Sequence, residues 1–422
     1  MSLLIAVFSG AWPYIKLILL SIAWFLPSKR LSVKTRGILL QCLDILGKWS
    51  LIDLIVLVMM MVAFRFHIVS PDDLEFLPPG ILEADIIVTA GWGIFAFIIA
   101  TVISLILSHV MIAFHRAAIG SVFDTSNETL DRQVSSSGTK SYVCLKSFKC
   151  GNRKGKRYRF TRLGLAFMII IVVESLLLSI VGAAVDSFSF EFLGLAGIAL
   201  GKESKASYSL ISIATAVYQY DLKSFVLSGS FLLFSFVIPL AHLVVLICLW
   251  VIPMQLSHQR NMFLAAEVLD AWSALEVFML SLLAAILEIN QFAQFIVGDK
   301  CYYIQKILND YLSDLVPGGD TSCFGVGVTL KAGCYTLIAA ALVGLFTGQL
   351  FTRLIEQALE DIAEEEGLNV ENTHAKACGE KSATMLGEFM IKCCLMEKID
   401  AQNKNAMPEN VSICGDKSIQ QH

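Results

Sequence analysis

Long runs of apolar residues recur along this chain, separated by shorter polar stretches. Each run approaches the length needed to cross about 30 Å of hydrocarbon as a helix. Strands of a membrane barrel would instead alternate apolar and polar residues over about ten positions. The runs lie at roughly 3–26, 49–66, 88–114, 163–185, 225–252, 272–297 and 328–352. The pattern predicts an all-α polytopic membrane protein with about seven spans.

Two of these runs carry the same marks in the same register. The string FSGAWPYIK, which contains Pro13 and Lys16, returns as FSFVIPLAH, with Pro239 and His242 at the matching places. A proline within a span removes a backbone donor and bends the helix. The repetition therefore predicts equivalent kinks beside a basic-type residue in two related parts of the chain.

A second motif follows each copy: a Trp-Ser pair with a carboxylate four residues after the tryptophan. Its members are Trp49, Ser50 and Asp53 in the first copy, and Trp272, Ser273 and Glu276 in the second. Internal repeats are typical of membrane transport folds. We therefore interpret the chain as a duplicated module that keeps one ionisable pair in each copy, Lys16 with Asp53 and His242 with Glu276.

The repeat divides the chain into four parts. We define residues 1–114 as the first module, with three spans, and 163–355 as the second module, with four; nothing in the first corresponds to the span at 163–185. A polar, basic linker at 115–162 joins them. The tail at 356–422 opens with an acidic run and is predicted to form a short helix followed by disorder.

Composition and charge fix the class and the predicted orientation. The chain is 56% hydrophobic and 16% charged, with a mean hydropathy of +0.69, whereas a soluble domain carries about 25% charged residues. Lysine and arginine gather at 27–48 and 115–162, while 67–87 is acidic. Basic loops stay on the cytoplasmic side. We expect the N-terminus outside and the C-terminus in the cytoplasm.

Charged groups inside the spans are the candidates for function. Burying one costs at least about 2.5 kcal/mol on insertion scales, so each should face protein or water and find a partner. Glu174 and Glu288 join the two predicted pairs. Glu174 could share a polar face with the serines at 175 and 179 or serve packing, and Glu288 could face the outer water. Four tryptophans, Trp24, Trp49, Trp250 and Trp272, are predicted to mark the inner membrane interface.

Other chemistry is absent from the sequence or weakly indicated. The chain has no GxxxxGK[ST], no GxGxxG after a strand and no HExxH, and no nucleophile–base set, so we expect neither an enzyme nor a cofactor, metal or nucleic-acid site. Cys301 and Cys323 share a predicted outer loop, where a disulfide and two free thiols are equally compatible. The basic stretch 146–162 would attract anionic lipid headgroups or simply fix the topology.

The strings SGAWPYIKLILL and LGKWSLIDLIVLVMMMV, with their second-module counterparts, resemble the paraquat-inducible protein A family. The resemblance covers roughly 1–114 and 163–355. It implies that Pro13, Lys16, Trp49, Ser50 and Asp53 form the module motif, with His242 and Glu276 as substitutions in the second copy. It also implies lipid movement between membranes and an MCE-type partner. The family's zinc ribbon is not legible here.

Two functions fit these observations. The leading interpretation is lipid transport or membrane-lipid homeostasis through an intramembrane polar cavity. The alternative is a membrane scaffold or partner-binding subunit that transports nothing, in which the same polar pairs only fix the packing of helices.

Overall fold

The computed structural model of the chain describes residues in fifteen ranges. These are 6–27, 29–63, 66–69, 83–86, 91–124, 142–143, 149–151, 157–160, 162–193, 205–218, 222–252, 254–287, 289, 325–365 and 396–399.

Helices dominate both modules. In the first, a π-helical turn, Ala6–Ala11 (η1), leads into α2, Trp12–Phe25. A turn then leads to α3, Val33–Ile45, which continues through a 3-10 segment, Leu46–Leu51 (η2), into α4, Ile52–Ala63. The third long helix is α5, Trp92–Asp124.

The second module opens with α7, Arg162–Ala184, and a short helix, α9, Leu210–Val217. Next come α10, Leu222–Leu232, a π-helical turn, Leu233–Val237 (η5), and α11, Ile238–Val251, which form one continuous span. The remaining helices are α12, Leu256–Trp272, the helical stretch 275–287, and α14, Ala332–Glu365.

Six of these helical stretches are long and apolar enough to cross a membrane, and α2 is a shorter apolar helix. The all-α polytopic prediction is confirmed. Two predicted loops were wrong, however. The segments 27–48 and 254–271 are largely helical, because α3 and α12 extend their spans by several turns. Both stretches carry charged residues, which lowered their apparent hydropathy and hid the helices.

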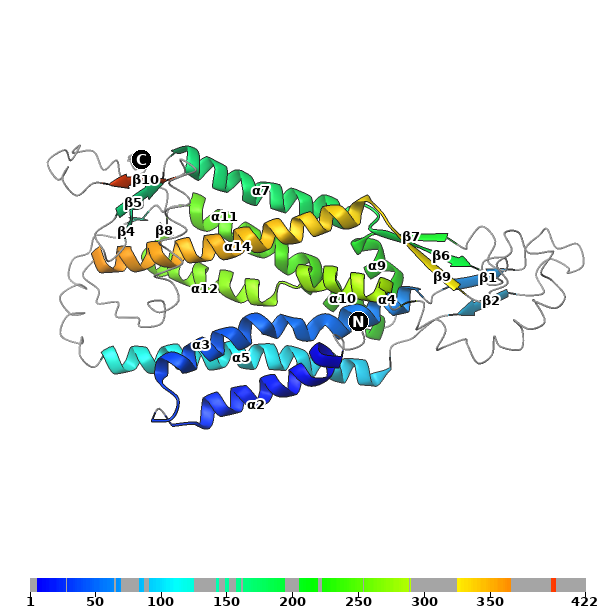
Figure 1. Cartoon of the computed structure of the whole chain (residues 1–422), viewed down its shortest axis with the longest axis horizontal. Coiled ribbons are helices and arrows are strands. Elements are labelled where there is room, and N and C mark those ends of the chain that lie inside the picture. The colour runs from blue at the N-terminus through cyan, green and yellow to red at the C-terminus, as the bar shows by residue number, and fades with distance from the viewer. Residues whose placement is uncertain are drawn as a thin grey trace, which may run out of the picture.

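Strands gather at the two ends of the helical body (Figure 1). At one end β1, Phe66–Val69, pairs with β2, Glu83–Ile86, and a second sheet has the order β7-β6-β9. The strands of this second sheet are β6, Phe188–Leu193, β7, Lys205–Tyr208, and β9, Gly325–Leu330. The predicted outer loops of both modules therefore lie at the same end.

The opposite end holds strands from the linker and the tail (Figure 1). There β5, Arg157–Phe160, pairs with β4, Lys149–Gly151, and with β10, Met396–Ile399. A small pair joins β3, Tyr142–Val143, to β8, Met254–Gln255. The tail, predicted to be largely disordered, thus contributes one strand to the linker sheet, and α14 extends helically through most of its acidic opening run.

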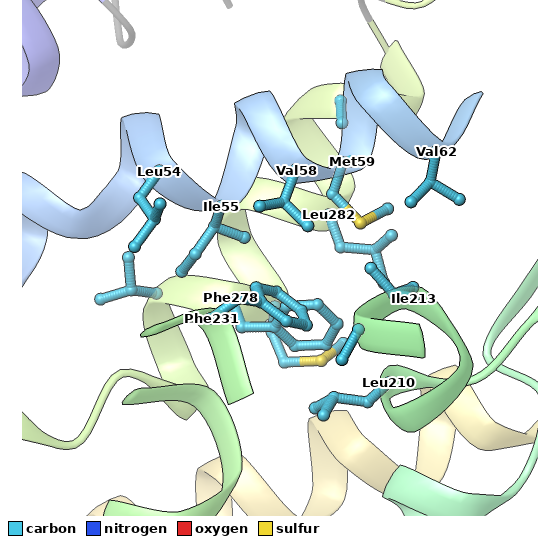
Figure 2. Close-up of a cluster of buried hydrophobic side chains, with 14 of the residues drawn as sticks. Leu54, Ile55, Val58, Met59, Val62, Leu210, Ile213, Phe231, Phe278 and Leu282 are labelled. Atoms are coloured by element: carbon cyan, nitrogen blue, oxygen red, sulfur yellow. The ribbon is translucent and has the colours of Figure 1, made fainter. Parts of the chain in front are cut away.

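An apolar core joins the two modules. Side chains of α4 pack against α9, α10 and the stretch 275–287 (Figure 2), and the rings of Phe231 and Phe278 meet edge to face at 5.7 Å between centroids. Val58 of α4 is fully buried in the same cluster. Burying a side chain of this size contributes roughly 1.5–3 kcal/mol. The modules are thus held together at the level of their helices.

The arrangement of strands predicts which segments share a side of the membrane. In a chain whose cysteines are replaced by serine, Ala84→Cys and Ala206→Cys should react with an impermeant maleimide from one side. Arg159→Cys should react only from the other, which the basic linker predicts to be cytoplasmic. Labelling of all three positions from the same side would contradict both the strand arrangement and the span count.

Candidate intramembrane site

Each Trp-Ser motif lies at the middle of a long span, where the regular helix is interrupted. The span Thr35–Ala63 passes through the 3-10 turn η2 at Trp49, and the span His258–Leu287 loses helical structure at Ser273 and Ala274. The predicted place of Trp49 and Trp272 at the inner interface was therefore wrong. Interrupted helices at mid-depth are how many membrane transporters build polar sites.

The interruption in the second module is tied to its proline. Ile238 donates to the carbonyl of Leu233, five residues back, so η5 has π geometry. In that register the carbonyl of Phe234 would bond to residue 239, but proline has no N–H. The carbonyl instead accepts a 3.0 Å bond from the N–H of Ala274, at the break. Because Pro239 has no N–H, the Phe234 carbonyl remains free to accept the bond that caps the second half of the broken helix.

The first module shows the same order of features. A π-helical turn precedes α2, which has Pro13 at its start, and the indole of Trp12 donates to the carbonyl of Leu46 in η2 at 3.1 Å. Both modules therefore link their proline helix to the break in the next span. Whether the modules superpose as whole repeats stays a prediction.

Lys16 is fully buried in α2. Its ammonium donates to the carbonyl of Ser104 in α5 at 3.3 Å, and Asp44 of α3 is the carboxylate whose charge acts on it. A Cβ placed at Gly47 would lie 2.8 Å from the Lys16 Nζ, so the glycine makes room for the ammonium group. Lys16 faces the protein interior, as expected, whereas its direct pairing with Asp53 stays a prediction.

A histidine on α5 connects the modules. The indole N–H of Trp272 donates to Nε2 of His109 at 2.5 Å, and Nδ1 of His109 lies 3.3 Å from Oδ1 of Asp44. Indole is only a donor, so Nε2 carries no hydrogen and the ring is the neutral tautomer with its hydrogen on Nδ1, toward Asp44. Trp272 of the second module is thus linked through His109 to the carboxylate of Asp44 in the first module.

The strongest link between the modules is an ion pair. Lys48 in η2 donates to Oε2 of Glu276 at 2.7 Å, and both side chains are at least 85% buried. A charge-assisted bond of this length is short and strong. Glu276 was predicted to pair with His242; its partner is Lys48, because the two breaks face each other at mid-depth.

His242 has a different partner from the one predicted. Its Nδ1 lies 3.9 Å from Oδ1 of Asp270 in α12, and the residue is only 4% exposed. Lys16 against Gly47 in the first module corresponds to His242 against Asp270 in the second, position for position along the repeat. His242 and Glu276 still line the same cavity, so a contact between them through one water molecule stays a prediction.

We call these buried groups the inter-module network: Lys16, Asp44, Lys48, His109, His242, Asp270 and Glu276. At its edge, Arg116 of α5 makes a two-pronged contact with Glu267 of α12, at 2.8 and 3.2 Å, where both side chains are more exposed. Asp44 and Glu267 each lie five residues before the tryptophan of their motif. The network therefore spans both modules with matched acidic positions.

A small cavity opens beside the network. It has about 20 Å³ of space for the centres of water molecules. Its polar lining comprises Ser175, Ser179, His242, Asp270, Ser273 and Glu276, from α7, α11, α12 and the break that follows it. That space is enough for a water molecule or a group of similar size, and Pro239 is also part of the wall.

Other predicted residues lie apart from this site. Glu174 is exposed on α7, whereas the neighbouring Ser175 is buried. Glu288, Cys301 and Cys323 lie outside the described residues, as do the side chains of the basic stretch 146–162. Within the described part of the chain, no group of three or more His, Cys, Asp or Glu residues is placed to hold a metal ion.

Sequence reasoning missed several members of the network. Asp44, Lys48 and Asp270 lie in segments that were predicted to be loops. Charged residues are common in loops, so these three were not candidates for a buried site. Asp44 carried a signal nonetheless, because it and Glu267 occupy equivalent places before the two Trp-Ser pairs. His109 lies well inside α5, which continues to Asp124.

Comparison with known families decides the class. Residues 168–305 match the model of the family described as paraquat-inducible protein A. Over this stretch of the second module the chain is similar to the paraquat-inducible protein A family. The match runs from α7 past the end of the 275–287 stretch, and so includes Pro239, His242 and Glu276. No curated protein and no solved structure matches this chain.

The buried ion pair gives a test by single and double substitution. Lys48→Met or Glu276→Leu alone leaves an unpartnered buried charge, which typically costs about 3–5 kcal/mol. The double variant Lys48→Met/Glu276→Leu should lose much less, because no charge is left behind. Thermal unfolding in detergent measures the differences. The exposed pair Lys205 and Glu191, at 3.5 Å on the outer sheet, is the control and should contribute under about 1 kcal/mol.

The glycine beside Lys16 gives a second test. Gly47→Ala should destabilise the protein by about 1–3 kcal/mol, because the new methyl group would collide with the Lys16 ammonium and with Leu105. Gly229→Ala in α10 is the matched control: its Cβ would meet nothing within 4 Å, and alanine favours a helix. Equal stability of the two variants would contradict the close approach of Lys16 to η2.

Proposed function

We propose that this membrane protein moves lipid, by admitting the polar part of a lipid to the inter-module network while the acyl chains stay in the bilayer. The observation that carries the proposal is the network itself, a set of buried charges at mid-depth that is shared between two modules. Charged residues inside a membrane are costly, and they commonly mark paths for substrates or ions.

The energetics support a functional role for these charges. Replacing a buried ion pair by well-packed apolar residues is often neutral or stabilising, so packing alone does not require Lys48 and Glu276. Both lie where spans are interrupted, and interrupted spans leave backbone groups and side chains free to rearrange. A network of this kind can exchange a protein partner for a polar ligand without leaving a charge unpaired.

The size of the cavity bears on how transport would proceed. The present space admits a group of about the size of water, not a whole headgroup. Entry of a phosphate-bearing headgroup would therefore require the modules to move apart around the Lys48–Glu276 contact. An MCE-type partner, and anionic lipids at the basic linker, belong to the same proposal and rest on the family resemblance and on charge.

The scaffold alternative has one observation in its favour. One ion pair within the network, Lys48 with Glu276, and one at its edge, Arg116 with Glu267, are already formed. A complex that only needed fixed helix contacts would look the same at these two pairs. The alternatives differ in whether a folded protein without the charges still moves lipid.

Reconstitution in vesicles tests the proposal. The variant Lys48→Met/Glu276→Leu should fold but lower the transfer of a fluorescent lipid between leaflets at least tenfold, measured by dithionite quenching. The control Lys205→Met/Glu191→Leu should transfer lipid like the unchanged protein. Mass spectrometry should also find less lipid co-purified with Asp53→Ala. Unchanged transfer by the folded Lys48/Glu276 double variant would favour the scaffold instead.

A further inference from the structure

The cavity beside His242 has polar groups that no protein partner satisfies. Ser175 is completely buried on α7, and its Oγ has no hydrogen-bond partner among the described residues. The Oγ of Ser179, one turn further on, donates to the carbonyl of Ser175 at 2.8 Å, so its lone pairs remain available. Both serines line the cavity.

His242 adds a ring nitrogen to the same cavity. Its Nε2 is buried and has no partner within the described part of the chain, while Nδ1 faces Asp270 at 3.9 Å. A neutral ring that directs its hydrogen toward Asp270 presents Nε2 as an acceptor. A buried polar atom left without a partner costs about 1–3 kcal/mol, so a ligand or water is expected there.

The charges of the lining do not cancel. Glu276 pairs with Lys48 at 2.7 Å, whereas Asp270 has no lysine or arginine partner within the described part of the chain and lies 3.9 Å from His242. The Asp270 side chain is 38% exposed, so its carboxylate lies at the mouth of the cavity. The site therefore combines one carboxylate that lacks a lysine or arginine partner among the described residues with acceptors on Ser175, Ser179 and His242, all three more than nine-tenths buried.

We propose that this cavity binds a small ammonium group. The group is either a free cation, such as ammonium or ethanolamine, or the terminal –NH3+ of an ethanolamine-type headgroup. Three or four N–H donors on a compact cation match a carboxylate, an imidazole nitrogen and serine hydroxyls. The small volume excludes a trimethylammonium group, which has no N–H to donate. The cavity lacks the grouping of three ligating side chains that a metal ion would use.

Binding to the free probes tests the site without any assumption about transport. Ethanolamine hydrochloride and ammonium chloride, titrated at constant pH and ionic strength into the protein in detergent, should raise the unfolding temperature with saturation. Tetramethylammonium and sodium chloride should not. An equal rise with all four salts, or none with either ammonium probe, would overturn the proposal; the latter is also the result expected if a protonated His242 neutralises Asp270.

Matched variants locate the effect. Asp270→Asn should weaken ethanolamine binding at least tenfold, and Ser175→Ala severalfold without any change of charge. Asp186→Asn on the outer surface and Ser281→Ala, a fully buried serine whose hydroxyl bonds to the carbonyl of Val277, should bind like the unchanged protein. If Asp270→Asn does not fold, Ser175→Ala against Ser281→Ala still decides. Equal binding by those two serine variants would place the ligand elsewhere.

Native mass spectrometry distinguishes the two sources of the ammonium group, and this arm alone rests on the proposed lipid function. Retention of phosphatidylethanolamine over phosphatidylcholine, lost in Ser175→Ala, would identify a lipid headgroup. Binding of free ethanolamine without any lipid preference would identify a small-cation site, leaving the cavity assignment intact while removing the support for lipid recognition there.

Discussion

A buried charge in a membrane must have a partner, and in this protein the partner of the central charge lies in the other module. The 2.7 Å pair of Lys48 and Glu276 joins two spans at mid-depth. Neither residue can leave without exposing the other, at a cost of about 3–5 kcal/mol. The relative position of the two modules is therefore set by charge as well as by the apolar core around Val58 and Phe278. Apolar packing is not directional, whereas an ion pair has one preferred geometry. The ion pair therefore fixes how the two modules are aligned with each other.

Backbone chemistry explains why the pair can form there at all. A proline cannot donate, so the π-helical turn before α11 leaves the Phe234 carbonyl free, and Ala274 takes it. That bond holds open the break that places Glu276 opposite η2. The π turn, the proline without an N–H and the broken span are linked in this way, and the first module has the same elements in the same order. The kink is thus a means of presenting side chains rather than a defect in packing.

Much of this organisation was readable from periodicity and motif spacing. Apolar length gave most of the spans, and the paired Trp-Ser motifs mark the places where two spans are interrupted, although the interruptions themselves were not predicted. The partners were not readable, because a motif matched within each module suggested pairs within each module. In space, Glu276 meets Lys48 of the other module, since the breaks of the two modules face each other, and His242 meets Asp270 within its own module. The helices α3 and α12 were missed because both carry charged residues that pair with a neighbouring helix. These charges lower the local hydropathy, so the segments 27–48 and 254–271 resembled loops.

The distribution of charge over the network bears on how it can work. Lys48 pairs with Glu276 and Arg116 pairs with Glu267, whereas Asp270 at the cavity mouth has no lysine or arginine partner in the part of the chain that the structure describes. A site that is fully neutral has no electrostatic reason to admit a cation, and one with several free carboxylates would not remain closed in a membrane. A single uncompensated carboxylate next to a closed ion pair lies between these limits. A cationic group that reaches Asp270 adds a positive charge within the field of Lys48 and Glu276, and so changes the balance of the contact between the modules. Occupancy of the cavity and the spacing of the modules are then coupled through one set of charges, which is the physical link that a carrier requires and a fixed scaffold does not.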